Sequence, residues 1–381
     1  MALYVHWPFC LRKCPYCDFN SHVRAQVDEE AFSKALLDEL DYFAKLSPDH
    51  YLTSVFFGGG TPSLMPAKTV GAVIEKAQNY WTPQGDLEVT LEANPSSVEA
   101  GRFKDFASAG VNRVSIGVQS LRDDQLKFLG RLHSAKEAIV AVDLAQNIFP
   151  RASMDMIYAR PRQNVDAWLN ELDEALAFGL DHYSLYQLTI EEGTAFHLQQ
   201  QRGELRAADE DSAYDMYVST QNAMNAAGLP AYEVSNHARA GFESQHNLTY
   251  WNGGLYTGVG PGAHGRIRLR DKGMVAVAQV KKPETWQVQV KGLGHGCNIV
   301  KPITPDDRAY ERLMMGLRLT EGVDLIQISK EEGVDMPSLI DDDAKRMLVD
   351  EGLILTDGAR LKTTPAGRLL LNTVTSQLMG V

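Results

Sequence analysis

Short apolar runs alternate with longer amphipathic stretches up to about residue 235. Apolar runs of four to eight residues favour strands, whereas apolar positions repeated every three or four residues favour helices. Strands are expected at Leu3–Val5, Thr53–Phe57, Leu87–Leu91, Arg113–Ile116, Ala152–Ile157 and Tyr183–Leu188. Helices are expected at Glu30–Leu46, Val70–Tyr80, Val98–Ala109, Asp123–Leu129, Ser134–Asn147, Val165–Phe178 and Ala208–Ala227.

This alternation predicts an α/β fold in which helices cover the outer face of a parallel sheet, as a barrel or a doubly wound sheet. A closed eightfold barrel usually needs about 250 residues, and the pattern here fades too early for one. We therefore predict an incomplete (β/α)6 barrel over residues 1–235.

Two further regions are expected downstream. Residues 236–302 form a Gly-rich and basic connecting segment. Residues 303–381 read as a separate domain with helices at Arg308–Arg318, Met336–Ile340 and Ala344–Glu351. A hairpin at Gly352–Thr363, turning at Asp357-Gly358, follows these helices. The order predicts a mostly helical, winged-helix-like domain at the C-terminus.

The charge of the chain bears on its partners. Its 381 residues include 37 basic and 49 acidic side chains, a formal net charge of −12. Binding to nucleic-acid phosphates requires an excess of Lys and Arg, so we expect no nucleic-acid partner. The winged-helix-like region alone carries nine basic and fourteen acidic side chains, which argues against a DNA-binding regulator.

The expected location is a reducing cytoplasm. No apolar run approaches the roughly 18 residues that span a bilayer. The start, Met1–His6, lacks the basic segment and long apolar stretch of a signal peptide. In that compartment the four cysteines are not expected to form disulfides.

Three of these cysteines lie close together, as Cys10-x-x-x-Cys14-x-x-Cys17 in the loop after the first expected strand. Three thiolates at this spacing can bind three irons of a [4Fe–4S] cube and leave the fourth iron open to a ligand. The alternative is a structural zinc site, which normally needs four ligands. Asp18, His6 or His22 would then supply the fourth.

The segment Tyr4–Cys17 resembles the cluster loop of radical S-adenosylmethionine (SAM) proteins, in the branch of the oxygen-independent coproporphyrinogen III dehydrogenases. The resemblance covers most of the chain. Further similar stretches follow in the same order at Phe57–Leu64, Glu92–Pro95, Gly117–Ser120, Leu129–Arg131 and Asp155–Tyr158.

The resemblance implies a SAM site at the carboxyl ends of the strands, where barrel enzymes build their sites. Its expected members are Tyr4, Tyr16, Gly59, Gly60, Thr61, Glu92, Gln119, Arg131 and Asp155. Glycines leave room for the methionyl group, and carboxylates accept hydrogen bonds from its amine and from the ribose hydroxyls. An arginine pairs with its carboxylate. The alternative for each residue is an ion pair, a cap or core packing.

Two functions remain open within this family. One is oxidative decarboxylation of coproporphyrinogen III by the dehydrogenase. The other is that of a haem chaperone of the HemW type, which binds haem and passes it to a recipient haemoprotein, expected to be respiratory. The dehydrogenases carry a fourth cysteine where this chain has Phe19, and they extend further ahead of the cluster loop. Both differences favour the chaperone.

His246-Asn247-Leu248-Thr249-Tyr250-Trp251 matches the HNxxYW signature of the chaperone branch. Imidazole is an axial ligand of haem iron, so the resemblance makes His246 a haem candidate. Tyr250 and Trp251 would offer flat faces to the macrocycle. The alternative is a hydrogen-bonded core histidine with aromatic packing around it.

The segment Arg266–Lys301 has a net charge of +6 within this acidic chain. Arg266, Arg268 and Arg270 alternate, so they would share one face of a strand. That face suits haem propionates or the surface of an anionic membrane. A charged, solvated strand edge is the alternative.

Overall fold

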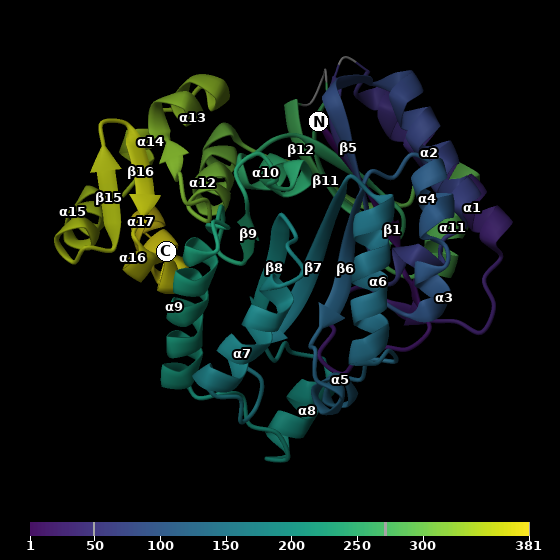
Figure 1. Ribbon diagram of the computed structural model, residues 1–381. Helices are drawn as coiled ribbons and strands as arrows, with labels where there is room; N and C mark the ends of the chain where they lie inside the picture. The colour runs from purple at the N-terminus through teal and green to yellow at the C-terminus, as the bar shows by residue number, and fades with distance from the viewer. Residues whose placement is uncertain (49, 270–272, 381) are drawn as a thin grey trace.

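The computed structural model describes residues 1–48, 50–269 and 273–380. Within these residues, an 11-stranded sheet dominates the fold, in the order β13-β12-β11-β10-β1-β4-β5-β6-β7-β8-β9 (Figure 1). The strands from β1 to β8 in this order pair in parallel. They are β1 (Ala2–Trp7), β4 (Tyr51–Gly59), β5 (Thr82–Ala93), β6 (Arg113–Gln119), β7 (Arg151–Tyr158) and β8 (His182–Gln187).

Helices connect these parallel strands and cover one face of the sheet (Figure 1). The main ones are α1 (Glu29–Leu46), α2 (Ala67–Tyr80), α4 (Phe103–Ser108), α6 (Ala135–Ile148), α7 (Val165–Leu176) and α9 (Glu210–Ala226). Short ones are η1 (Pro62–Leu64), α3 (Ser97–Ala100), α5 (Asp123–Phe128) and α8 (Ala195–Gln201). The edge strands β13 and β9 are not paired with each other in the described part of the chain. The predicted incomplete barrel of six β/α units is confirmed.

The region 236–302 adds strands to this same sheet. They are β9 (Asn236–Ala238), β10 (Tyr256–Val259), β11 (His264–Leu269), β12 (Gly273–Gln279) and β13 (Cys297–Pro302). Strand β10 pairs in parallel with β1, and the next three strands follow as antiparallel neighbours. The region also contains α10 (Gln245–Trp251) and α11 (Pro283–Leu293). Its separation from residues 1–235 as a unit of its own stays a prediction.

The two faces of the sheet differ in chemistry. On β1, Leu3, Val5 and Trp7 are buried in the main hydrophobic core, together with Leu36 and Leu40 of α1. Because side chains alternate along a strand, the opposite, concave face carries the other set of residues. That set is polar although it is buried, and it includes Ser54, Thr90, Arg113, Ser115, Ser153, His182 and Ser184. The concave side is therefore lined for polar ligands rather than for packing.

The C-terminal region has a hydrophobic core of its own. Its helices are α12 (Pro305–Gly316), α13 (Leu325–Glu332), α14 (Met336–Leu339), α15 (Asp342–Asp350), α16 (Pro365–Leu369) and α17 (Leu371–Met379). Its strands β14 (Val323–Asp324), β16 (Arg360–Thr363) and β15 (Ile354–Asp357) form a small antiparallel sheet. The winged-helix-like prediction is confirmed, including the hairpin. None of the described helices is long and apolar enough to cross a membrane.

One expected helix is broken. The sequence predicts Val98–Ala109 as a single helix, but α3 ends at Ala100 and α4 begins at Phe103. Gly101 lies at the break, where helix propensity is low. The Arg102 guanidinium donates to the carbonyls of Ser63 and Met65, at 2.6 and 2.7 Å. At the break, the Arg102 side chain therefore holds the turn that follows β4 in place.

Candidate functional site

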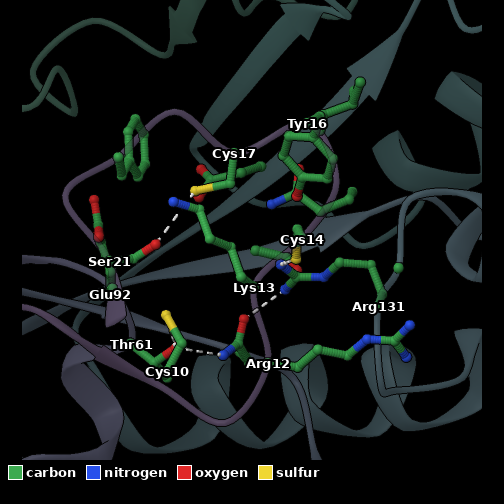
Figure 2. A pocket seen from close by; sticks show the side chains of 18 of the residues that line it. Cys10, Arg12, Lys13, Cys14, Tyr16, Cys17, Ser21, Thr61, Glu92 and Arg131 are labelled. Atoms are coloured by element: carbon green, nitrogen blue, oxygen red, sulfur yellow. Dashed lines mark hydrogen bonds between the residues drawn. The ribbon is translucent and has the colours of Figure 1, made fainter. Parts of the chain in front are cut away.

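A cavity of about 500 Å³ opens at the carboxyl ends of the parallel strands, and all three clustered cysteines line it (Figure 2). They belong to the loop that runs from β2 (Phe9–Cys10) to β3 (His22–Val23). The expected SAM residues Tyr16, Gly59, Gly60, Thr61, Glu92, Gln119, Arg131 and Asp155 line the same cavity. Residues from six separate segments of the chain are therefore brought to one site.

The thiols of this loop are free, and each lies near a polar side chain. Thr61 Oγ1 is 3.5 Å from Cys10 Sγ, Arg131 Nη1 is 3.7 Å from Cys14 Sγ, and Ser21 Oγ is 3.9 Å from Cys17 Sγ. Burial raises the pKa of the Cys10 and Cys17 thiols, so binding of iron must displace their protons.

Three thiolates of a [4Fe–4S] cube each bind a different iron, so they need not converge on one point. In the part of the chain that the structure describes, no group of three His, Cys, Asp or Glu side chains could hold a single metal ion. The zinc alternative would take its fourth ligand from Asp18, His6 or His22, and hydrogen bonds already engage both histidine rings, to Asn20 among others. Three free sulfurs around one cavity fit a cube.

The glycines at the end of β4 are required by the protein's own backbone. Gly59 has φ +117°, and a Cβ there would lie 2.6 Å from the His6 ring. A Cβ at Gly60 would lie 2.8 Å from the Pro8 carbonyl carbon. The strand end therefore passes directly beneath the start of the cluster loop, and only glycine permits this. The same glycines leave backbone exposed to the cavity.

Two carboxylates lie within the cavity on neighbouring parts of the sheet. Burial and the nearby Asp155 carboxylate raise the pKa of Glu92 to about 8, although the Gly59 amide donates to it at 3.2 Å. Burial raises the pKa of Asp155 to about 6, opposed by the hydroxyls of Ser184 and Ser115. Both side chains therefore favour a cationic or hydrogen-bond-donating ligand, whose binding would restore their charge.

Arg131 is fixed at the cavity wall beside the cluster loop. Its Nη2 donates to the Gly117 carbonyl at 2.9 Å and to Asn94 Oδ1. Gln119, at the end of β6, has φ +67°, a backbone conformation that few residues other than glycine adopt. Strain of this kind persists only where the surroundings impose it, and such positions cluster at functional sites. Asn94 lies within the Glu92–Pro95 stretch, but the sequence does not predict it as a site residue.

Tyr4 lies apart from the other expected SAM residues. It is not among the residues that line the cavity in the described chain. Its hydroxyl is 3.1 Å from His6 Nδ1, and its ring stacks on Phe56 with centroids 6.2 Å apart. Tyr4 lies on the concave face, further from the carboxyl ends of the strands than the residues that line the cavity. Its contact with a cofactor stays a prediction.

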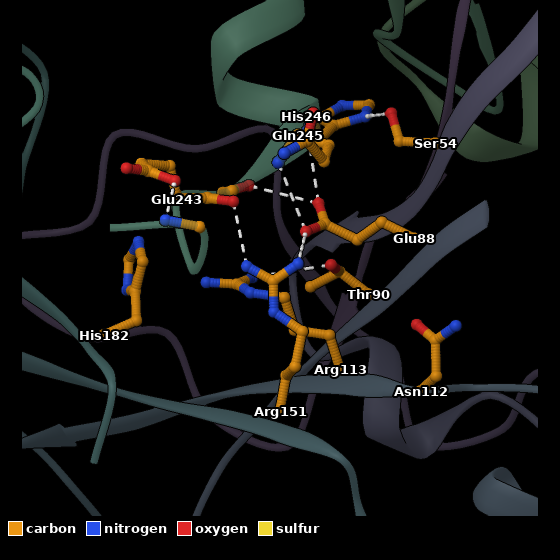
Figure 3. Close-up of polar contacts among 12 residues, drawn as sticks. Ser54, Glu88, Thr90, Asn112, Arg113, Arg151, His182, Glu243, Gln245 and His246 are labelled. Atoms are coloured by element: carbon orange, nitrogen blue, oxygen red, sulfur yellow. Dashed lines mark hydrogen bonds and ion pairs between the residues drawn. The ribbon is translucent and has the colours of Figure 1, made fainter. Parts of the chain in front are cut away.

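The HNxxYW motif forms α10, which closes the opposite end of the barrel (Figure 1). The amides of Gln245 and His246 donate to the Glu88 carboxylate at 3.2 and 3.1 Å, and Arg151 pairs with it at 2.9 Å (Figure 3). Glu88 precedes Glu92 by four residues on β5, which is roughly 13 Å of strand. The motif is thus separated from the cluster cavity along the barrel axis.

The His246 ring is engaged on both sides. Nδ1 is 2.9 Å from Ser54 Oγ, and Nε2 is 2.8 Å from Tyr250 OH. The side chain is 1% exposed and stacks on Phe56. Trp251 lies under the Arg318 guanidinium, 4.5 Å from the ring centroid. Haem binding by His246, Tyr250 and Trp251 stays a prediction, and it would require α10 to move.

The basic segment is partly neutralised within the fold. Arg266 pairs with Glu311 of α12 at 2.8 Å. Arg268 lies on the same face of β11 and is exposed. Arg270, the third arginine of the expected row, lies outside the described residues. Arg268 therefore carries the accessible charge of this row.

Comparison with known proteins identifies the family of the chain. Residues 4–175 match the radical SAM superfamily, and residues 303–370 match the HemN C-terminal domain. The chain is 40% identical to radical S-adenosyl methionine domain-containing protein 1, mitochondrial, from Bos taurus, over 99% of this chain and 87% of that protein. It is 33% identical to the Heme chaperone HemW of Escherichia coli K12, over 98% of this chain and 97% of that protein. This chain belongs to the HemW group of the radical SAM family.

The fold of this HemW relative also matches a solved structure. Coproporphyrinogen III oxidase (HemN) from Escherichia coli superposes with a TM-score of 0.83, covering 99% of this chain and 89% of that one. The identity is 20%, so the likeness concerns the fold alone. Membership of the family implies a [4Fe–4S] cluster and SAM.

Sequence reasoning missed several residues at the mouth of the cavity. Arg12 and Lys13 lie between the first two cysteines, and Tyr186 lies near the end of β8. Leu11, Phe19 and Leu132 are 64%, 58% and 61% exposed there. The charged pair inside the cysteine motif was visible in the sequence. The apolar rim was not, because Leu132 comes from a segment far along the chain from Leu11 and Phe19 of the cluster loop.

Proposed function

We propose that this protein is a haem chaperone, which binds haem and transfers it to a recipient haemoprotein, expected to be respiratory. Its cofactors would be a [4Fe–4S] cluster and SAM, both held in the cavity at the carboxyl ends of the strands. The observation that carries the proposal is the cluster loop itself. Three cysteines face the cavity, and Phe19 stands exposed where the dehydrogenases carry a fourth cysteine. Full-length similarity to proteins named HemW supports it.

Each part of the site has a distinct task in this proposal. Cys10, Cys14 and Cys17 would bind three irons, and Glu92 and Asp155 would accept hydrogen bonds from the SAM amine and ribose. Arg131 would orient the carboxylate of the same ligand. When bound, the cluster and SAM supply one-electron chemistry at the open iron. The apolar rim at Phe19 and Leu132 would limit the access of water.

The second candidate function is oxidative decarboxylation of coproporphyrinogen III, which the HemN-like fold permits. One experiment separates the two. The cluster is reconstituted under anaerobic conditions, and the same sample is assayed for haem binding, for haem transfer to an apo-cytochrome, and for coproporphyrinogen turnover. We expect binding and transfer without turnover. Protoporphyrinogen IX formed at catalytic rates would overturn the chaperone proposal.

The proposed place of action is the cytoplasm, where reduced thiols are available for a cluster. The basic segment supports a peripheral contact with an anionic membrane, which would bring the chaperone near membrane-bound recipients. The acidic net charge supports the absence of a nucleic-acid partner. Sedimentation with vesicles that contain anionic or only neutral lipids tests the membrane contact.

A further inference from the structure

The strands β11, β12 and β13 present an open face on the concave side of the sheet. Directly opposed residues of antiparallel strands share a face. One row across the strands is His264, Ala278 and Ile299, and the next is Arg266, Ala276 and Lys301. The central alanines are only half-buried, and the outer His264, Ile299 and Lys301 are exposed. Small side chains in the middle leave a shallow platform with longer side chains at its edges.

His264 is the exposed histidine of the described chain, and no hydrogen bond to its ring is found among the described residues. By contrast, His246 is buried and has a partner at each ring nitrogen. Burial and the charges of Arg266 and Lys281 lower the pKa of His264. Its imidazole is therefore neutral at physiological pH, with a nitrogen lone pair free to bind a metal.

Cations flank the same platform. Lys281 is close enough to His264 to influence it electrostatically. Measured from His264, Lys301 lies two strands away, roughly 10 Å across the sheet, and two residues further along the strand direction, roughly 7 Å. Neither lysine has an ion-pair partner among residues 1–48, 50–269 and 273–380. Two alanines and Ile299, with a free imidazole and two unpaired ammonium groups beside them, are complementary to a flat, apolar, dianionic molecule that carries a metal.

The platform also adjoins the cluster loop. Asn20 Nδ2 donates to the Pro261 carbonyl at 2.8 Å and to the Lys281 carbonyl at 2.9 Å. Pro261 lies in the turn from β10 to β11 that leads into His264. A molecule on the platform would therefore lie beside the loop that carries the cysteines, on the same side of the barrel as the cavity.

We propose that haem binds across the concave face of β11–β13, with His264 as an axial ligand of its iron and with Lys281 and Lys301 paired to its propionates. This inference rests on the proposed chaperone function and names the site of its cargo. It assigns the iron to a residue outside the HNxxYW motif. It also accounts for unpaired cations within an acidic protein.

Haem titration of the full-length, cluster-reconstituted protein tests this proposal. His264→Ala should shift the Soret band and lower haem affinity at least about tenfold, which corresponds to roughly 1.4 kcal/mol. In His264→Gly, imidazole added to the solution should restore the band. Lys281→Gln combined with Lys301→Gln should lower affinity and weaken its salt dependence while the Soret band keeps its position. Ala278→Trp should block binding although no ligand is removed.

His197→Ala is the matched control, because His197 is a half-buried histidine on the distant α8. It should bind haem like the wild type. Different results would overturn the chaperone function and the assignment of the haem site. If the wild type binds no haem, the chaperone function is overturned. If the wild type binds haem and both His264 variants show its affinity and spectrum, only the assignment to β11–β13 is overturned.

Discussion

Removing the His246 imidazole should destabilise the protein rather than abolish a haem ligand. The side chain is 1% exposed and joins α10 to β4 through Ser54 Oγ, at 2.9 Å. Its other nitrogen is 2.8 Å from Tyr250 OH, and its ring stacks on Phe56 with centroids 4.8 Å apart. His246→Ala breaks both hydrogen bonds and empties the space between the two elements.

The expected loss follows from these contacts. Each hydrogen bond contributes about 1 kcal/mol net, and more where the remaining partner stays buried without one. The lost packing of a buried ring adds about 1 kcal/mol, less than for a phenyl group because the imidazole is smaller and polar. The free energy of unfolding should therefore fall by about 3 kcal/mol. For a domain of this size that lowers the melting temperature by roughly 6 °C or somewhat more.

Thermal unfolding followed by circular dichroism measures this effect. A double-mutant cycle with Ser54→Ala isolates the contact between the two side chains, with an expected coupling of about 1 kcal/mol. His197→Ala serves as the control and should change stability by less than about 0.5 kcal/mol. Haem titration of the same variants completes the comparison. If His246→Ala melts like the wild type but loses the Soret band, the packing argument is refuted and His246 is the haem ligand.

Three further changes test other parts of the structure. Cys14→Ala should leave two thiolates in the cavity and prevent assembly of a full cube, so iron analysis should give well below about four irons per chain; a full complement would contradict the cluster assignment. SAM affinity should rise from pH 6.5 to 8.5, because Glu92, with a pKa of about 8, must lose its proton to receive the SAM amine. Calorimetry should show a flat profile for Glu92→Gln, and an equal slope in both proteins would exclude this role. Buried Glu39 has its pKa raised to about 7, mainly by burial. Its contribution to stability is therefore greatest below about pH 4.5 and is lost as the pH rises through 7. The wild type should lose about 3 kcal/mol relative to Glu39→Gln over that range, measured by urea unfolding; parallel curves would refute it.

The regular part of the fold was predictable because its signals are local. The parallel strands and the helices between them follow from apolar periodicity, as at Arg113–Gln119 and Glu29–Leu46. The alternating arginines predict a strand at β11, but the sequence does not predict β9, β10, β12 and β13. On β12, Val275 and Val277 alternate with other residues, which is a local signal for a strand. The place of this region in the sheet, however, depends on β10, which pairs with β1 some 250 residues earlier in the chain. That pairing is specified by tertiary contacts that no short window contains.

The candidate site was predictable to different degrees for different residues. Glu92 directly follows one expected strand and Asp155 lies near the end of another, so the rule for barrel sites placed them at the cavity. His246 was chosen from a motif, and a motif does not say which end of the barrel its helix reaches. The capping contacts of Glu88 with α10 decide this, and they join residues 158 positions apart. His264 gave no signal in the sequence, because its exposure depends on alanines in a neighbouring strand.

Asn20 offers a last prediction, because it connects the cluster loop to the platform proposed for haem. Its amide donates to Pro261 and Lys281, its Oδ1 lies 3.1 Å from His22 Nε2, and its carbonyl oxygen lies 2.9 Å from His6 Nε2. A cluster that orders the loop should therefore favour haem binding, and haem should favour the cluster by the same factor. We expect haem affinity to be several-fold higher with the cluster than without it, as measured by parallel titrations. In Asn20→Ala this difference should disappear, whereas Asn112→Ala, which alters an asparagine directly before β6 that bonds the backbone of β5, should keep it. Equal haem affinities of the wild type with and without cluster would show that the two sites are not coupled through this loop.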